Sequence, residues 1–449
     1  METKKKGFPA AFWVCACTEI FERLAYYLGR SLILIFVTAS VATGGLGLSD
    51  TVAANMQSNL TAFSYLLPLF GAVIVDKYIG ARYTTPVGIF IAAAGNFTGG
   101  IAKSSAGVYA MIFLVSLGLA LFKNGAIIGR VITDKSQMDP AFSMRYTLVN
   151  VGAFIGTFLV GILYKDVFAK DGVLGFAPCF KMAALMMVLG GLWYIFVCWR
   201  FLGDLGKLPF KKTLTEEEKA AEAKKKEEKG TKQPLTTIEK KRIGAIFVAS
   251  LFSIVFWIFW YLGYMPVYFY WAENMDWVVA GYQVPSTWFD AANSLFCVIL
   301  GPVTAALWKK LAARPQGDMS LFRKTGLGIA IIGVGYLFYA AIDIMRGGEK
   351  ASVLWLIVFA FLLTMGEMFF SPLGHSFISK YSPSRYLAVM MSVWGFATFI
   401  AAKSYGRVYG LLFGGKIEFK VACIGVAVVS FAAALIMIAL DKKLSALVD

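Results

Sequence analysis

The chain has 449 residues, of which 58% are hydrophobic and 16% are charged, and its formal net charge is +16. Soluble domains are about 45–50% apolar and about 25% charged, so this composition excludes a disordered chain, a disulfide scaffold and an ordinary cytosolic enzyme. Nucleic-acid binding would need the positive charge gathered on one soluble face, whereas here Lys and Arg stand mainly between long apolar runs. The composition therefore indicates a protein of the lipid bilayer with no nucleic-acid partner.

About twelve apolar runs are long enough to cross a bilayer as helices, which takes about 20 predominantly apolar residues. They cover residues 10–37, 51–76, 84–101, 106–132, 142–163, 177–201, 243–271, 287–311, 322–344, 350–381, 385–412 and 417–441. The first run is too long and too charged to be a signal peptide. The pattern predicts an all-α membrane protein.

One long polar segment, residues 202–242, separates the first six runs from the last six. We expect an N-terminal six-helix bundle at 1–201, a cytoplasmic polar linker at 202–242 and a C-terminal six-helix bundle at 243–449. The Glu and Lys residues of the linker favour a solvated helix or a flexible tether. A regulatory or partner-binding role is the alternative.

Basic residues concentrate in alternate connections between the runs: Lys4, Lys5, Lys6, Lys77, Arg82, Arg130, Lys135, Arg145, Lys309, Lys310, Arg314, Arg323, Lys324, Lys380, Arg385, Lys442 and Lys443. The positive-inside rule then places both termini in the cytoplasm, in a multi-pass protein of the plasma (inner) membrane. The six cysteines lie in or beside apolar runs without framework spacing, so we expect no disulfides.

The first run carries six polar residues at helical spacing: Glu19, Glu22, Arg23, Tyr26, Tyr27 and Arg30. Their offsets place all six on one stripe of a helix. We expect Glu19 to pair with Arg23, four residues on. Because ionisable groups inside a membrane are costly, such a stripe favours the wall of a polar binding cavity, and a structural ion-pair stripe is the alternative.

Other runs supply matching polar groups. Lys123 and Glu367 stand in the middle of the fourth and tenth runs, and Asn150 and Asn293 add uncharged groups at similar depth. Buried carboxyl groups, here Glu19, Glu22 and Glu367, are candidates for proton exchange. Lys403 and Arg407 lie toward the outer end of the eleventh run, where we expect their side chains to snorkel.

No motif of catalysis or of metal binding stands out. The single histidine, His375, has no second His or Cys ligand near it, so we predict no metal site. There is no Walker loop, no G-x-S-x-G elbow and no H-E-x-x-H pair, which argues against ATP-driven transport and against an enzyme.

Several motifs resemble those of the proton-coupled oligopeptide transporter family, within the major facilitator superfamily. The first-run string resembles E-x-x-E-R-F-x-Y-Y-G-x-R, with Leu24 in the Phe position, and Tyr146-x-x-x-Asn150-x-Gly152 resembles F-Y-x-x-I-N-x-G. Lys123-Asn124 matches a Lys-Pro-Asn motif without its proline. Further matching residues are Tyr65, Pro68, Gly71, Asp76, Gly80, Arg82, Asn293, Pro302, Trp308, Glu367, Ser371, Pro372, Gly374, Pro383 and Trp394.

The resemblance implies a major facilitator fold and a proton-coupled symporter that imports di- and tripeptides by alternating access. It implies proton coupling by Glu19, Glu22, Arg23, Lys123 and Glu367. It implies substrate binding by Arg23, Tyr26, Tyr27, Arg30, Tyr65, Lys123, Asn150, Asn293, Glu367, Ser371 and Trp394. Asp76 and Arg82 would stabilise the inner gate. We expect no cofactor besides the proton as coupling ion, and a monomer.

The chain departs from the family in its seventh run. Many relatives carry Gln or an acid there, whereas this chain has Trp260, Tyr261 and Leu262, so a usual counter-charge for Arg30 is missing. One alternative is therefore a transporter of the same fold for another small anion or a drug-like substrate. A peptide sensor that does not transport and a membrane-embedded enzyme are the others, and the lone histidine argues against most designs of the enzyme.

Overall fold

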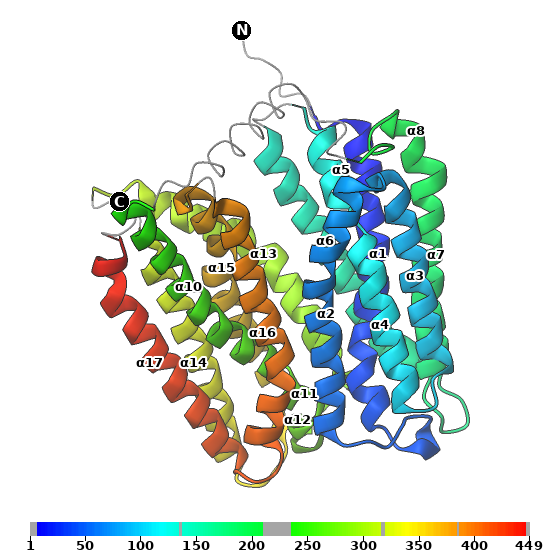
Figure 1. Ribbon diagram of the computed structural model, residues 1–449. Coiled ribbons are helices and arrows are strands. Elements are labelled where there is room, and N and C mark those ends of the chain that lie inside the picture. The colour runs from blue at the N-terminus through cyan, green and yellow to red at the C-terminus, as the bar shows by residue number, and fades with distance from the viewer. Residues whose placement is uncertain (1–6, 134–136, 210–234, 316–318, 384–385, 446–449) are drawn as a thin grey trace. The chain divides into compact units, whose positions relative to one another are not determined.

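The computed structural model describes residues 7–133, 137–209, 235–315, 319–383 and 386–445 (Figure 1). The side chains of residues 76, 139, 371–377, 379–380, 388 and 444–445 are outside this description. Also outside it are most of the predicted linker and the basic residues Lys4, Lys5, Lys6, Lys135 and Arg385.

The chain divides into two compact units. The first unit comprises Met1–Ser49 and Phe63–Leu214, and the second comprises Asp50–Ala62 and Thr215–Asp449. One helix, α2 (Asp50–Lys77), thus contributes its first 13 residues to the second unit and the rest to the first. The domain boundaries predicted from the linker stay a prediction.

The first unit is helical throughout its described core. Besides the later part of α2, its elements are α1 (Ala10–Thr38), η1 (Val41–Thr43), α3 (Ala81–Ile101), α4 (Ser105–Leu121), α5 (Asn124–Val131), α6 (Met138–Ile162), η3 (Leu163–Val167), α7 (Phe176–Trp193), η4 (Tyr194–Cys198) and α8 (Trp199–Leu202). The turns η3 and η4 are π-helical. The helix α1 packs against α5, α6 and α7, so it lies at the centre of the unit.

The second unit combines helices with four very short strands. Its elements are α10 (Thr237–Leu262), α11 (Met265–Tyr268), α12 (Tyr270–Asn274), β1 (Met275–Asp276), β2 (Val278–Val279), β3 (Tyr282–Gln283), α13 (Trp288–Ala312), α14 (Leu321–Met345), β4 (Ala351–Ser352), α15 (Trp355–Tyr381), α16 (Leu387–Phe413) and α17 (Phe419–Ser445). Parallel β1 and β4 pair Met275 with Ala351, and antiparallel β2 and β3 form a hairpin. Each strand has only two residues and lies between helices. The all-α class predicted from the apolar runs is confirmed.

Each predicted apolar run falls on a helix or on a helix with a break. Eight helical segments among the described residues are long and apolar enough to cross a membrane: Asp50–Val75, Ser105–Val131, Pro140–Val167, Phe176–Leu202, Thr237–Asn274, Trp288–Ala312, Leu321–Met345 and Phe419–Lys443. The four other runs fall on α1, α3, α15 and α16, of which α1 has 29 residues but carries the charged stripe.

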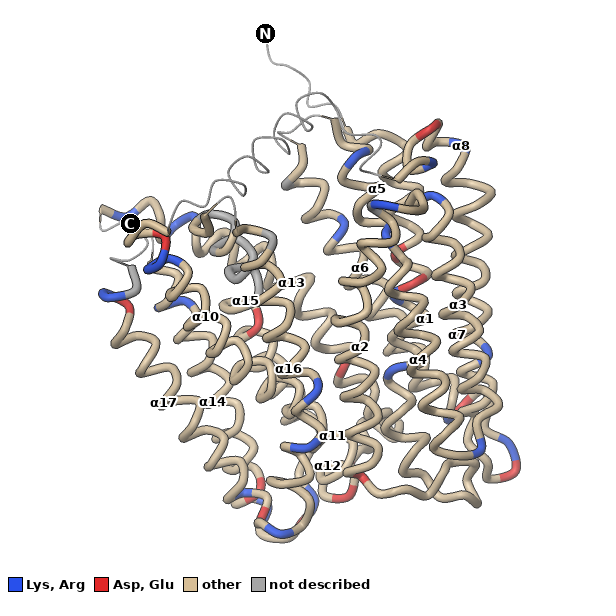
Figure 2. Tube along the Cα trace, in the orientation of Figure 1, with Lys and Arg blue, Asp and Glu red and all other residues tan. Residues whose placement is uncertain are grey.

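Charged residues lie mostly at the ends of the helices in each unit, and few lie along their middles (Figure 2). This is the distribution that a bilayer imposes, because a charge in the hydrocarbon region costs a few kcal/mol (about 2.5–3.5 on insertion scales). The few charges that do lie within helices therefore mark the candidate site.

Candidate functional site

The polar stripe of α1 faces the interior of the first unit. Glu19 is 1% exposed and Glu22 is 2% exposed, and Tyr26 and Arg30 are also buried. Two acids and a guanidinium held away from water need partners close by, because an isolated buried charge is strongly unfavourable.

Two glycines of α6 bring that helix close to the stripe. A Cβ at Gly152 would lie 2.8 Å from the carbonyl oxygen of Ile20, and one at Gly156 would lie 2.4 Å from that of Leu24. Only glycine permits backbones to approach so closely, as small residues do in other membrane helix pairs. The crossing sets α6 against the acidic part of α1.

Glu19 finds its cation on α6. The Nε of Arg145 donates to Glu19 Oε1 at 2.8 Å, and the amide Nδ2 of Asn124 donates to the same oxygen at 3.2 Å. The predicted pair between Glu19 and Arg23 is therefore wrong. The physical reason is that the α1–α6 crossing offers Glu19 a cation from outside its own helix, while Arg23 engages its neighbour Glu22.

Glu22 and Arg23 form a two-pronged ion pair. Arg23 Nε lies 2.5 Å from Glu22 Oε2, and Arg23 Nη2 lies 2.6 Å from Glu22 Oε1. The Arg23 guanidinium also lies 4.8 Å from the ring centre of Tyr26. Its side chain is 24% exposed, so this cation is more open than the acid that it neutralises.

The two tyrosines continue the stripe toward Arg30. Their rings meet edge to face at 5.3 Å, and the Arg30 guanidinium lies 5.7 Å from the ring centre of Tyr27. Tyr26, Tyr27 and Arg30 thus form one contiguous surface of aromatic faces and positive charge, a combination that suits recognition of a carboxylate beside an apolar group.

Lys123 lies at a break between two helices. The sequence places it in the middle of one span, but α4 ends at Leu121 and α5 begins at Asn124. Its Nζ donates to the carbonyl oxygen of Pro68 on α2 at 2.8 Å. The break releases the next residue, Asn124, to donate to Glu19 and to the carbonyl oxygen of Cys15.

Two other predicted residues of the first unit are more open. Tyr65 on α2 is 43% exposed. Asn150 on α6 is half-buried, and its amide donates to the carbonyl oxygen of Tyr146 one turn earlier at 3.0 Å. Their roles in substrate binding stay predictions.

Arg82 joins the start of α3 to the turn after α8. Its guanidinium donates to the carbonyl oxygens of Gly203 and Trp199 and lies 5.0 Å from the Trp199 ring centre. In the same turn, a hydrogen bond from Lys207 lowers the pKa of the exposed Asp204 carboxyl. The predicted gate partner, Asp76, has its side chain outside the described part of the chain.

Glu367 is the buried acid of the second unit. It is 9% exposed on α15, and its Oε2 accepts from Asn293 Nδ2 of α13 at 3.2 Å and from Cys297 Sγ at 3.8 Å. The amide of Asn293 also donates to Thr364 Oγ1 at 2.8 Å. The contacts that the structure gives Glu367 are neutral, which distinguishes this acid from Glu19 and Glu22.

Aromatic rings pack on Phe370, three residues after this acid on α15. Phe370 on α15 stacks at 4.0 Å on Phe256 and at 6.1 Å on the predicted substrate residue Trp394. Trp260 packs at 5.4 Å against Trp257, so the aromatic run on α10 forms part of the same wall. The predicted residue Ser371 lies outside the described side chains, as does His375.

Lys403 joins two helices of the second unit. Its Nζ donates to Asn59 Oδ1 in the first part of α2, and Ser58 Oγ donates to the carbonyl oxygen of Ala402 at 2.6 Å. The sequence predicts that the Lys403 side chain snorkels toward the membrane surface. Its ammonium group instead contacts the side-chain amide of Asn59 on a neighbouring helix. Arg407, one turn later, is exposed.

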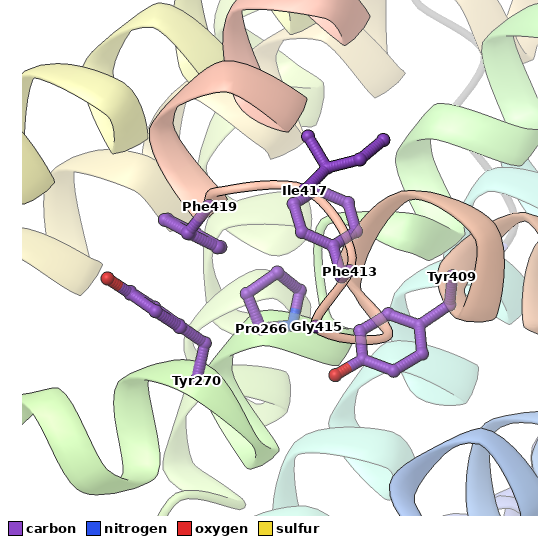
Figure 3. Close-up of a pocket in the computed structure, with 7 residues that line it drawn as sticks. All are labelled: Pro266, Tyr270, Tyr409, Phe413, Gly415, Ile417 and Phe419. Carbon is purple, nitrogen blue, oxygen red and sulfur yellow. The ribbon is translucent and has the colours of Figure 1, made fainter.

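A cavity of about 120 Å³ lies elsewhere in the second unit. Rings of Tyr270, Tyr409, Phe413 and Phe419 line it, with Pro266, Gly415 and Ile417 (Figure 3). Arg346 and Asp343 hold the Tyr270 hydroxyl from outside this lining. None of the predicted site residues belongs to the cavity.

The chain is similar in sequence to known transporters. The model of the POT family matches residues 205–416. A di-/tripeptide transporter of Lactococcus lactis subsp. cremoris is 24% identical over 86% of this chain and 86% of its own length. An uncharacterised transporter of Bacillus subtilis, YclF, is 24% identical over 90% of this chain and 88% of its own.

The fold is confirmed by solved structures. A peptide transporter POT solved in complex with sulfate superposes with a TM-score of 0.86 and 23% identity, covering 99% of this chain and 97% of that one. The multi-pass, all-helical membrane fold of the major facilitator type, expected from the motifs, is therefore present in this chain.

Three polar side chains that contact predicted site residues cannot be recognised as partners from the sequence motifs. In the sequence, Arg145 looks like one of the basic residues of a connection, although it stands where the family signature has Phe, immediately before Tyr146. Asn124 stands out only as part of a motif, and Thr364 belongs to none of the motifs. The signal for Thr364 was its position three residues before Glu367, on the same helix face.

Proposed function

We propose that this chain is a member of the POT family and a proton-coupled symporter that imports di- and tripeptides by alternating access. It works as a monomer in the plasma (inner) membrane with both termini in the cytoplasm, and it transports without catalysing a reaction. The proton is its coupling ion, and no other cofactor takes part. The relatives named as di-/tripeptide transporters support the substrate class.

The observation that carries the proposal is the division of charge between the units. The first unit holds Arg23, Arg30 and Lys123, and the second holds the buried acid Glu367 among neutral partners. A peptide with free ends carries one carboxylate and one ammonium group. Arg23, Arg30 and Lys123 suit its carboxylate, and Glu367 suits its amino terminus.

The remaining predicted residues take their roles around these charges. Tyr26, Tyr27, Tyr65, Asn150, Asn293, Ser371 and Trp394 contact the peptide. Glu19, Glu22, Arg23, Lys123 and Glu367 form the set through which proton and substrate binding are linked, because they are the charged groups that lie within the helices beside the proposed substrate ligands. Asp76 and Arg82 stabilise the inner gate.

Transport by purified protein in proteoliposomes tests the proposal. With labelled Ala-Ala outside, an inward proton gradient should give accumulation that a protonophore abolishes. Counterflow into vesicles loaded with unlabelled Ala-Ala should proceed without any gradient. Excess tripeptide should compete, whereas nitrate and single amino acids should not.

The alternatives give different results in the same assay. Competition by nitrate alone would indicate a transporter of small anions. Binding of Ala-Ala without counterflow would indicate a sensor and would contradict the proposal.

A further inference from the structure

We propose that Arg145 is a positioning residue that holds Glu19 as a fixed anion, so that Glu19 takes no part in proton exchange. The acids left to exchange protons are Glu22 and Glu367. This inference rests on the proposed function, because it divides the labour within the coupling set.

The first support is the enclosure of Glu19. Its side chain is 2% exposed, and one carboxylate oxygen accepts from both Arg145 and Asn124. Asn124 is completely buried and is itself anchored to the carbonyl oxygen of Cys15 at 2.8 Å. A carboxylate that accepts a charged and a neutral donor in a closed site is stabilised in its ionised form.

The second support is that the cation is itself held in place. A Cβ on Gly125 of α5 would lie 2.8 Å from Arg145 Nη2 and 2.9 Å from its central carbon, so the guanidinium rests directly on that glycine. Its central carbon also lies 5.9 Å from the ring centre of Phe142. The Arg145 guanidinium thus has protein contacts besides Glu19 and does not depend on it for its position.

The third support is the contrast with Glu22. Its cation, Arg23, is the adjacent residue on the same helix, whereas the cation of Glu19 comes from another helix, α6. Arg23 is also a proposed ligand of the substrate carboxylate. A peptide can therefore draw Arg23 away from Glu22, whereas Arg145 is not among the proposed ligands of the peptide.

Charged groups from two helices lie around Glu19. Among the described residues they include Arg145 from α6 and Glu22 and Arg23 from α1 itself. The helix α5 contributes the neutral amide of Asn124. Since Glu22 is already paired with Arg23, the cation left to Glu19 is Arg145.

A double-variant cycle tests the inference. The variants are Glu19→Gln, Arg145→Met and the combination of both, with Arg145→Lys as the conservative change. Removing one member of a buried ion pair leaves the other without a partner, whereas replacing both with neutral groups of similar size is often tolerated. We expect each single variant to lose at least tenfold in gradient-driven Ala-Ala accumulation. The double variant and Arg145→Lys should stay within about threefold of wild type.

The pH profile of counterflow gives a readout that a purely structural role would not move. In Arg145→Met, Glu19 has lost its cation and should titrate within the measured range, adding a pH dependence that the double variant lacks. Gly125→Ala should shift the guanidinium without changing any charge, and it should give a smaller change of the same kind.

Two outcomes would overturn the inference. One is a double variant that retains counterflow but cannot accumulate Ala-Ala, since Glu19 would then carry the proton. The other is a double variant that has lost counterflow as well, because a neutral pair should fill the same space. Wild-type protein that fails to accumulate Ala-Ala would instead contradict the proposed function, so the two failures are distinguishable.

Discussion

At the scale of single residues, Glu367 offers the most direct test of proton coupling. Its contacts in the structure are Asn293 and Cys297, so a neutral amide in its place costs no ion pair. We expect Glu367→Gln to reduce gradient-driven Ala-Ala accumulation at least tenfold. Counterflow should persist at high Ala-Ala concentration but with a raised KM, because glutamine still accepts a hydrogen bond from the amino terminus without pairing with its charge. Uptake and counterflow in parallel proteoliposomes would measure the two.

The matched control for that change is Glu418→Gln. Glu418 is an exposed acid of the same unit, and the substitution removes its surface ion pair with Lys420. It should leave both assays unchanged, because exposed pairs contribute little. Accumulation by Glu367→Gln equal to that of Glu418→Gln would remove Glu367 from the coupling set.

Single residues also show which features of the site can be predicted from the sequence. The stripe of α1 could be predicted, because offsets along one helix determine which side chains share a face. The partner of Glu19 could not, since it depends on how two helices cross. Arg145 looks like one more basic residue in a connection until Gly152 and Gly156 bring α6 against Ile20 and Leu24.

At the scale of elements, the α1–α6 crossing should be sensitive to a single methyl group. A Cβ at Gly156 would lie 2.4 Å from a backbone carbonyl oxygen, which cannot move aside as a flexible side chain can. We expect Gly156→Ala to destabilise the protein by about 1–3 kcal/mol through overpacking. A thermal unfolding curve in detergent, followed by tryptophan fluorescence, should show a lowered Tm.

Gly425→Ala on α17 is the comparison, because nothing lies within 4 Å of the added Cβ and the residue is helical and exposed. Alanine is intrinsically about 1 kcal/mol better than glycine in a helix, so this variant should unfold at the same or a higher temperature. Equal Tm values for the two variants would mean that the crossing is not as tight as the structure has it.

The sequence predicts where helices occur more reliably than whether each helix is continuous. The run 106–132 is apolar throughout, yet it breaks at Phe122 and Lys123, where tertiary contacts satisfy the freed backbone: the Lys123 amide donates to Thr85 Oγ1 at 3.4 Å. The start of α10 at Thr237, six residues before the predicted run, could have been predicted, because Thr236 and Glu239 have the spacing of the capping box that they form.

At the scale of the whole molecule, α2 belongs to both units, and its first 13 residues pack on α16. A Cβ at Gly406 would lie 2.7 Å from the carbonyl oxygen of Ala54, and Ser58, 1% exposed, bonds to Ala402 across the same contact. Alternating access requires that some tight helix contacts open and reclose. We infer that this contact between α2 and α16 is one of those that open.

Gly406→Ala should therefore shift the equilibrium toward the opened contact. In a Ser58→Cys background, we expect a membrane-impermeant maleimide to label residue 58 several times faster when Gly406→Ala is also present, as measured by peptide mass spectrometry. The native Cys17, half-buried in the first unit, serves as an internal reference and should keep its rate. Adding Gly425→Ala instead should change neither rate, since that glycine has open space around it. Unchanged labelling of residue 58 with Gly406→Ala would mean that α2 and α16 stay together through the transport cycle, so that α2 itself would have to bend between Ala62 and Phe63.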